Sequence, residues 1–131
     1  METKFTSLYK LIARQLAVFQ PLAVRQSSFI VNEVPADFRI MADEKTLSSL
    51  VHSMLSSVVS HSRNSCIRVS VKQFGNIILL KFRERKGEIV FDMNRTNVMA
   101  LTEKLGACIF MNDGRKKTNM LTLSFPNMLV A

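Results

Sequence analysis

The feature that most constrains this sequence is an apolar stripe running through residues 44–61. The stripe repeats at intervals of three residues and then one, which is the spacing of one face of an amphipathic helix. Its members are Leu47, Leu50, Val51, Met54, Leu55, Val58 and Val59. The opposite side is small and polar, and carries Ser48, Ser49, His52, Ser53, Ser56, Ser57 and Ser60. With Asp43 as its N-cap, the segment predicts a helix that packs one face on a core. Its serine-rich face is expected either to line a pocket or to accept a partner.

Strand and helix patterns on both sides of this segment predict the fold class. A helix is expected from Thr6 to Arg25, with Pro21 as a kink or an end point. Strands are expected at Ser28–Val34, Phe38–Met41, Cys66–Phe74, Asn76–Arg83, Glu88–Met93, Ala107–Asn112 and Thr118–Phe125. A last helix is expected at Asn97–Leu105, with Gly106 as its C-terminal cap. This order predicts an α+β fold, a two-layer α/β sandwich with helices on one face of a mixed, mostly antiparallel sheet.

Length and composition predict a single domain covering residues 1–131. With 47% hydrophobic residues the chain can build a core, and it contains no internal repeat or flexible linker. No apolar run approaches the roughly 18 residues that span a bilayer, and the N-terminus lacks a signal-peptide pattern. Cys66 and Cys108 lie in apolar, strand-like runs without metal-ligand spacing, so both are expected to be buried free thiols. We therefore expect a cytoplasmic, bacterial-type protein with no membrane partner.

The net charge of +8 raises the question of a nucleic-acid partner. The densest basic segments are Arg83–Lys86 and Arg115–Lys117, and each lies beside a glycine, as solvated turns do. Base stacking needs exposed aromatic side chains, and the chain has one Tyr and no Trp. Seven phenylalanines in strand-like runs are expected in the core instead: Phe29, Phe38, Phe74, Phe82, Phe91, Phe110 and Phe125. This argues against nucleic acid, which remains the third reading.

Three pieces of the sequence, in this order, carry a resemblance to a known family. The first is Ala42-Asp43 followed by the apolar stripe, and the second is the strand pair from Cys66 to Arg83. The third runs from Leu101 to Ala107 and closes with Asp113-Gly114, Thr118 and Leu121–Pro126. Together they resemble the ATP-binding catalytic domain of sensor histidine kinases, whose fold is shared with gyrase B, Hsp90 and MutL. The resemblance covers nearly the whole chain.

The resemblance also implies which residues would hold nucleotide, and several of those residue types are missing. The family carries two asparagines four residues apart on the central helix, the second of which ligates Mg²⁺. Those positions fall on Ser53 and Ser57, and a serine hydroxyl ends about one bond short of an asparagine amide oxygen. The adenine-binding Asp of the next strand aligns with Arg83, which offers only donors. A shift of one residue would bring in Glu84 as an acceptor, but it would also turn every strand side chain to the opposite face.

The family's mobile lid and glycine-rich phosphate cradle also look deleted. Only about a dozen residues separate Gly87 from the last helix, and Asp92–Thr96 contains no glycine. The vestigial nucleotide site would then comprise Ser53, Ser57, Arg83, Gly87 and Thr118. Basic side chains could still contact a small anion near its mouth, first Arg85, Lys86 and Arg95, and beyond them Arg83, Arg115, Lys116 and Lys117.

These losses predict a pseudo-ATPase domain that binds neither ATP nor Mg²⁺ and contains no catalytic or metal-ligating residues. Its expected role is regulatory contact with another signalling protein in a two-component-type pathway. The amphipathic N-terminal helix is the candidate for docking, including homodimer formation. The alternative is a divergent but competent ATP/Mg²⁺-binding kinase domain that uses Ser57 and Glu84. His52 and His61 are expected to be surface residues of the central helix, not phosphoacceptors.

Overall fold

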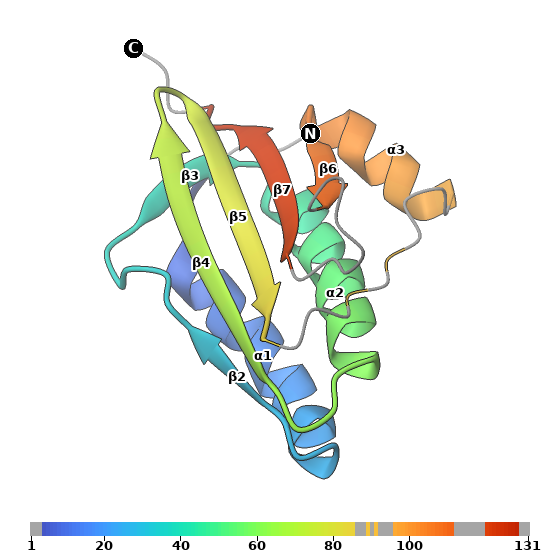
Figure 1. The fold of residues 1–131 in the computed structure, drawn as a ribbon. Coiled ribbons are helices and arrows are strands. Elements are labelled where there is room, and N and C mark those ends of the chain that lie inside the picture. Colours follow the sequence, from blue (N-terminus) through green and yellow to red (C-terminus); the bar gives the residue numbers. More distant parts are fainter. Residues whose placement is uncertain (1–3, 86–88, 90, 92–95, 112–119, 129–131) are drawn as a thin grey trace.

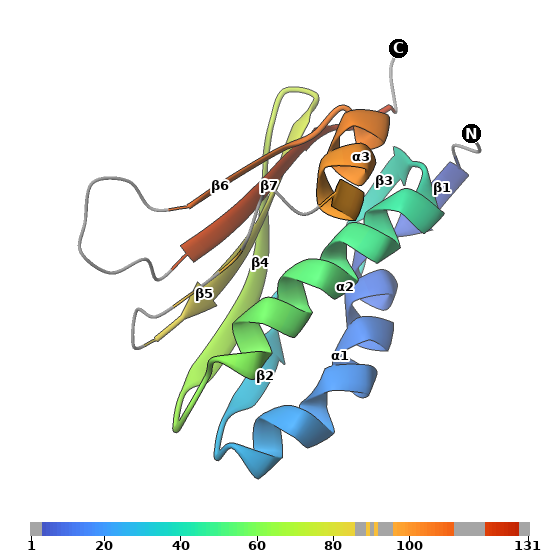
Figure 2. The same ribbon diagram turned by 90° about the vertical axis from the view of Figure 1, so that its right-hand side faces the viewer.

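The computed structural model describes residues 4–85, 89, 91, 96–111 and 120–128. They form two layers, a five-stranded sheet and a layer of helices against one of its faces (Figures 1 and 2). The three helices are α1 (Leu8–Arg25), α2 (Glu44–Ser60) and α3 (Thr96–Leu105). The strands are β1 (Lys4–Ser7), β2 (Phe29–Asn32), β3 (Arg39–Ala42), β4 (Cys66–Phe74), β5 (Ile77–Glu84), β6 (Cys108–Met111) and β7 (Met120–Pro126). The expected α+β two-layer sandwich is confirmed.

The main sheet has the strand order β2-β4-β5-β7-β6. Only the pair β2 and β4 is parallel, and the other three pairs are antiparallel. Strands β1 and β3 pair with each other in a separate two-stranded sheet. Asn127 ties the two sheets together. Its side-chain Oδ1 accepts from the backbone amide of Met41 at 2.9 Å, and its backbone N–H donates to the Asn76 carbonyl at 2.7 Å.

The core lies between the sheet and helices α1 and α2. All seven members of the predicted stripe on α2 are buried, with side chains at most 1% exposed. Inward residues of β4, β5 and β7 meet them, and alternate with outward residues as the pleat requires. The largest of these inward side chains are Phe82 and Phe125. The described helices include none that is long and apolar enough to cross a membrane.

Two glycines shape the chain where a left-handed backbone is needed. Gly75 has φ +59° in the two-residue turn between β4 and β5, so the predicted hairpin at Gly75-Asn76 is confirmed. Gly106 has φ +70° just after α3, where its amide donates to the Glu103 carbonyl at 3.1 Å. The amide of Ala107 bonds to the Thr102 carbonyl at 2.8 Å, which completes the C-terminal cap.

The N-terminal elements correct the sequence-based expectation. Residues 4–7 form β1, and α1 begins only at Leu8, because Ser7 caps the helix by accepting a hydrogen bond from the Lys10 amide at 3.2 Å. Pro21 does not end α1, which continues to Arg25. The proline lies on an exposed side of the helix, where water can bind the carbonyl that lacks its helical donor.

Two further expectations are wrong. The predicted strand Glu88–Met93 is absent at Ile89 and Phe91, which are buried but lie outside any strand, and its other residues fall outside the described ones. Three of the seven phenylalanines expected in the core are exposed, namely Phe29, Phe74 and Phe110. They occupy outward positions on their strands, because strand propensity alone does not say which face of a sheet is covered by helices.

Candidate functional site

Three helices enclose a shallow groove of about 390 Å³ along the serine-rich face of α2. Helix α1 contributes Gln15, and α3 contributes Asn97 and Leu101. The remaining lining residues belong to α2 and are Ser48, Ser49, His52 and Ser53. The groove is therefore lined mainly by hydroxyl, amide and imidazole groups. The sequence left two interpretations of the serine-rich face, the lining of a pocket or a surface for a partner. At this end of α2, the serines line a groove.

Contacts between α1 and α2 fix one wall of the groove. The Gln15 side chain donates from Nε2 to the Ser48 hydroxyl at 2.8 Å and to the Ser48 carbonyl at 3.3 Å. Gln15 is thus a polar residue that lies between the buried apolar residues Ile12 and Leu16 of α1 and is held by a contact with α2. The Phe19 ring packs on the exposed His52 ring with 4.9 Å between centroids. The contact with Phe19 holds the His52 ring at the rim of the groove.

The two serines at the family's asparagine positions lie half-buried on α2. Ser53 lines the groove, whereas Ser57, one turn later, is not among its lining residues. His61 follows the end of α2, and its Nδ1 lies 2.9 Å from the Ser57 carbonyl oxygen. The imidazole therefore lies at the C-terminal end of the helix and is exposed, and the expectation that His61 is a surface residue is confirmed.

The end of β5 places Arg83 and Glu84 on opposite faces of the sheet. Inward residues of this strand are Ile78, Leu80, Phe82 and Glu84, and the side chain of Glu84 is 2% exposed. Arg83 points to the opposite, helix-free face, where its guanidinium lies 3.9 Å from the Met120 sulfur. The residue that faces the helix layer at the strand end is therefore the acidic Glu84.

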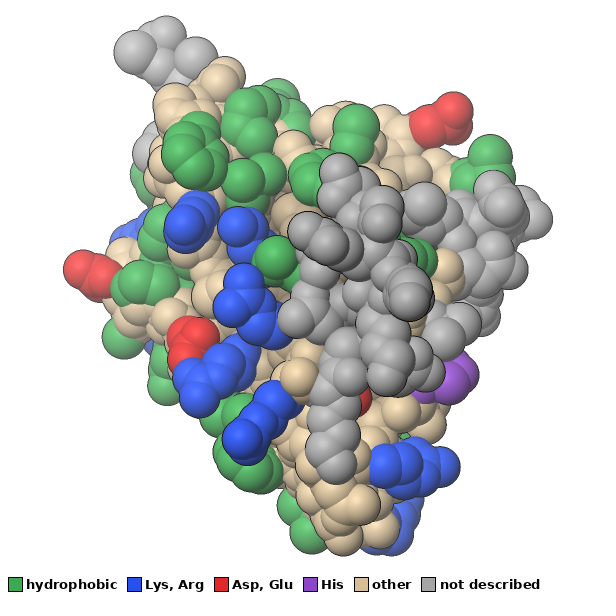
Figure 3. Space-filling view, in the orientation of Figure 1, with side chains coloured by type: hydrophobic (Ala, Val, Ile, Leu, Met, Phe, Trp, Pro, Cys, Tyr) green, Lys and Arg blue, Asp and Glu red, His purple; other side chains and the backbone are tan. Residues whose placement is uncertain are grey.

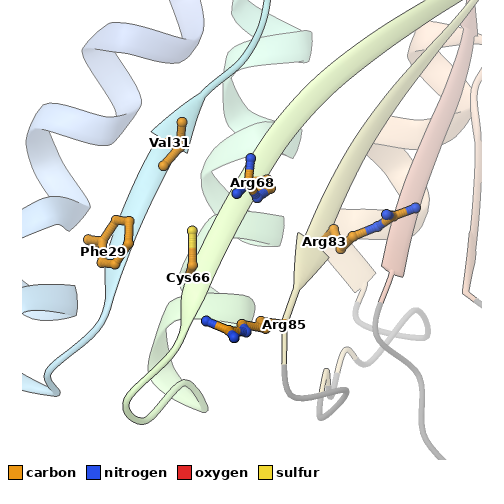
Figure 4. A pocket seen from close by; sticks show the side chains of 6 residues that line it. All are labelled: Phe29, Val31, Cys66, Arg68, Arg83 and Arg85. Atoms are coloured by element: carbon orange, nitrogen blue, oxygen red, sulfur yellow. The ribbon is translucent and has the colours of Figure 1, made fainter.

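Of the cations expected at the mouth of the site, those that the structure describes lie on the outer face of the sheet. Arg83 and Arg85 line a second depression, of about 400 Å³, on the outer face of the sheet, with Phe29, Val31, Cys66 and Arg68 (Figure 4). They therefore do not gather beside Ser53. Gly87, Thr118, Lys86, Arg95, Arg115, Lys116 and Lys117 lie outside the described residues.

Arg68 is held in this depression by an ion pair with Glu33 on the segment after β2. The hydrogen bond from its Nη1 to the Glu33 carboxylate, together with that negative charge and the nearby Cys66 thiol, raises the pKa of Arg68. The guanidinium therefore stays charged at any physiological pH. Cys66 is buried as expected, whereas Cys108 is exposed, contrary to expectation, because it points outward from the edge strand β6.

Solved structures of histidine kinase catalytic domains share this arrangement. The catalytic domain of histidine kinase ThkA matches with a TM-score of 0.79 at 13% identity, over 97% of this chain and 98% of that one. Histidine kinase AdeS of Acinetobacter baumannii gives a TM-score of 0.82 at 10% identity, over 98% of this chain and 68% of its own. The chain has the histidine kinase catalytic-domain fold.

Other neighbours agree with this assignment. The mycobacterial sensor histidine kinase MprB gives a TM-score of 0.74 at 13% identity, over 95% of this chain and 97% of that one. No family model matches the sequence, and no curated protein is detectably similar to it. The fold predicted from the resemblance is therefore confirmed by structure at sequence identities too low to transfer an activity.

Ser53 and Ser57, which the resemblance places at the family's two asparagine positions, offer hydroxyl groups there. The described lining residues of the groove include no carboxylate, lysine or arginine side chain. Within the described part of the chain, no group of three or more His, Cys, Asp and Glu side chains could hold a metal ion.

The sequence pattern alone did not reveal the depression on the outer face. Its lining combines residues of β2, β4 and β5 with the residue after β5, and these are neighbours only once the sheet order is known. A usable signal did exist, since outward positions of β4 and β5 alternate with apolar ones and repeatedly carry Arg or Lys. From the sequence, only Arg83 and Arg85 were considered among the cations of this face, and both were expected at a solvated turn or at the mouth of the nucleotide site.

Proposed function

We propose that this chain is a pseudo-ATPase domain of the histidine kinase type, which acts by protein contact in a two-component-type signalling pathway. One observation carries the proposal: the positions that would ligate Mg²⁺ and flank the phosphates are Ser53 and Ser57 on a correctly built α2. The scaffold is retained while the chemical groups are not. A domain of this kind keeps surfaces for recognition and loses phosphoryl transfer.

Charge supports the same reading. A nucleoside triphosphate carries several negative charges, and proteins balance them with Lys, Arg, Mg²⁺ or a row of backbone amides. The described groove lining includes no carboxylate, lysine or arginine side chain. Arg83 and Arg85, the two predicted cations that the structure describes, lie across the sheet on its other face. Phosphate binding in the groove would leave the negative charge uncompensated by these residues.

The exposed side of α1 is the proposed docking surface for the partner. The apolar face of α1 already packs inside the molecule, and its buried residues are Leu8, Leu11, Ile12, Leu16, Phe19 and Ala23. A second, exposed set remains on the same helix: Ala17, Val18, Pro21 and Val24. Val18 and Val24 are each 61% exposed, although valine is usually buried. We propose that this surface receives another signalling protein, or a second copy of the chain.

A second candidate function rests on Glu84. A buried carboxylate on the inner face of β5 can accept a hydrogen bond from an exocyclic amino group, which Arg83 cannot do. The domain could then retain an adenine site without metal or phosphate chemistry. This alternative predicts binding of adenosine and ATP with similar affinity, independent of Mg²⁺.

A thermal-shift series separates these possibilities. ATP, ADP, a non-hydrolysable ATP analogue and adenosine are each added at millimolar concentration, with and without Mg²⁺. A ligand at about a hundred times its dissociation constant stabilises a fold by about 2.7 kcal/mol, which moves the midpoint of a domain of this size by several degrees. The pseudo-ATPase proposal expects no shift with any of them, and a Mg²⁺-dependent shift would overturn it.

A shift with adenosine and ATP alike would favour the adenine site. Glu84→Gln should then abolish that shift, while the matched variant Glu103→Gln, on the exposed surface of α3, should leave it intact. Docking through α1 is tested by sedimentation of the wild type and of Val18→Ser/Val24→Ser. Loss of a dimer in this variant, but not in Met99→Ser on the exposed side of α3, supports pairing through α1.

A further inference from the structure

The described helices all pack on one side of the main sheet, and none of them covers its outer face (Figure 2). Its central strands β4 and β5 carry a column of cations, which Figure 3 shows as a band of blue across this face. The described members are Arg68, Lys72, Lys81, Arg83 and Arg85. Arg68 and Arg83 are direct cross-strand partners. The paired carboxylate of Glu33 neutralises only one of these five charges.

Exposed aromatic side chains surround this column. Phe29 lies on edge strand β2, Phe110 on edge strand β6, and Phe74 beside the β4–β5 turn. Their exposed fractions are 54%, 47% and 61%. Large apolar rings at such exposure are unusual for a core-forming residue type. The reason for excluding a nucleic-acid partner, that the phenylalanines fill the core, does not hold for these three.

The distribution of charge over this face points to a polyanion. Protein–protein interfaces place apolar residues at the centre and polar residues at the rim, with charged residues depleted from the centre. Here the order is reversed, because Arg68, Lys81 and Arg83 occupy the central strands and the phenylalanines stand outside them. An open antiparallel sheet with exposed aromatics and interspersed cations is a platform that suits unpaired bases and a phosphate backbone.

We propose that the outer face of the sheet binds single-stranded nucleic acid. Phosphates pair with the central cations, while bases stack on Phe29, Phe110 and Phe74. The depression of about 400 Å³ between Phe29 and the three arginines accepts one nucleotide unit, with its base on the ring and its phosphate at the guanidinium groups (Figure 4). Phe29 and Phe110 are four strand spacings apart, roughly 19 Å, so a strand must cross the face to reach both.

Duplexes are disfavoured on this surface. Paired and stacked bases offer no free ring face to isolated phenylalanines on a sheet, whereas an unpaired strand does. This proposal is independent of the nucleotide test above, because Glu84 and the α2 serines lie on the helix side. Free nucleotides could therefore fail to bind the groove while the outer face binds an oligonucleotide.

Fluorescence anisotropy with labelled 12-nucleotide strands tests the proposal over a series of salt concentrations. One arm uses single-stranded RNA, one the DNA of the same sequence, and one the corresponding duplex. The wild type should bind at least one single strand more tightly than the duplex. Lys72→Gln/Arg83→Gln should lower affinity about tenfold and reduce the slope of log affinity against log salt by about 1.4, since each phosphate contact contributes about 0.7.

Aromatic variants separate stacking from charge. Phe29→Ala and Phe110→Ala should each weaken binding by about tenfold without changing the salt slope. The matched charge control is Arg25→Gln/Lys104→Gln, two exposed cations on the helix side. All of these side chains are exposed, so thermal midpoints close to wild type confirm that the variants fold.

Three results would overturn the proposal. The control pair could weaken binding as much as the sheet pair, which would mean unspecific attraction to a basic protein. The duplex could bind as tightly as either single strand. Poly-glutamate could displace the strand while the phenylalanine variants bind normally, which would assign the face to an acidic protein.

Discussion

The Gln20 side chain on α1 forms hydrogen bonds with the outer edge of β2, as a neighbouring strand would. Its Oε1 accepts from the Ile30 amide at 2.9 Å, and its Nε2 donates to the Ile30 carbonyl at 3.1 Å. β2 is an edge strand, so this side of its backbone has no neighbouring strand to bind. One carboxamide therefore satisfies both polar groups of Ile30, and Gln20→Ala removes both bonds at once.

The expected loss of stability follows from the count of bonds. Each hydrogen bond contributes about 0.5–1.5 kcal/mol net, and a buried group left without a partner costs more than the bond itself contributes. Ile30 is only 5% exposed, so water cannot fully replace the carboxamide. Alanine regains a few tenths of a kcal/mol in helix propensity. The free energy of unfolding should fall by about 2 kcal/mol, which lowers the midpoint by roughly 6–8 °C.

Urea and thermal unfolding of Gln20→Ala measure this change directly. The matched control is Gln73→Ala, whose side chain makes a hydrogen bond of 2.9 Å to the Gly75 carbonyl at an exposed turn. That variant should stay within about 0.5 kcal/mol of wild type. An equal loss in both variants, or no loss in Gln20→Ala, would refute the claim that this side chain seals the sheet edge.

Three more predictions concern the packing that positions the site. Asn127→Ala leaves the Met41 amide without its acceptor and unties the small sheet, so unfolding free energy should drop by about 1–3 kcal/mol, read by urea titration. Leu55→Ala opens a cavity beneath α2, because the Leu55 side chain is 0% exposed, and should lower the free energy of unfolding by about 2–5 kcal/mol. Its control, Ser49→Ala on the exposed side of α2, should leave that free energy unchanged or raise it slightly. Gly106→Ala strains a backbone at φ +70° and should lower the thermal midpoint by several degrees, although 3.7 Å to the nearest Pro126 atom leaves room for the methyl group.

Elements with strong local signals were predictable from the sequence. The stripe on α2 leaves a single helix face to bury, and Gly75-Asn76 sets the length of the β4–β5 turn, so both were found with nearly correct bounds. Strand β1 was missed because Lys4–Ser7 has no alternation of its own and is held by pairing with β3. Pairing between segments 35 residues apart leaves no local pattern to detect.

The site was harder to predict because it depends on which face of each strand is covered. Arg83 and Glu84 are adjacent in the sequence, and only the sheet register decides that one faces outward and the other inward. The same limit applies to Phe29 and Phe110, whose residue type favours a core while their strand positions place them on the open face. Residue type and strand propensity gave no information about the layer order.

The pleat of β5 also explains how two unrelated surfaces can change independently in one small fold. Arg83 belongs to the outer face and Glu84 to the helix side, so substituting one alters one surface and leaves the chemistry of the other in place. Serines on α2 can remove metal binding without disturbing the sheet, because the apolar stripe on the same helix carries the packing. Cations can accumulate on β4 and β5 for the same reason, since their inward neighbours supply the core. On the two proposals made above, this histidine kinase-type scaffold lacks phosphoryl transfer on its helix side while the outer face of its sheet binds a different ligand.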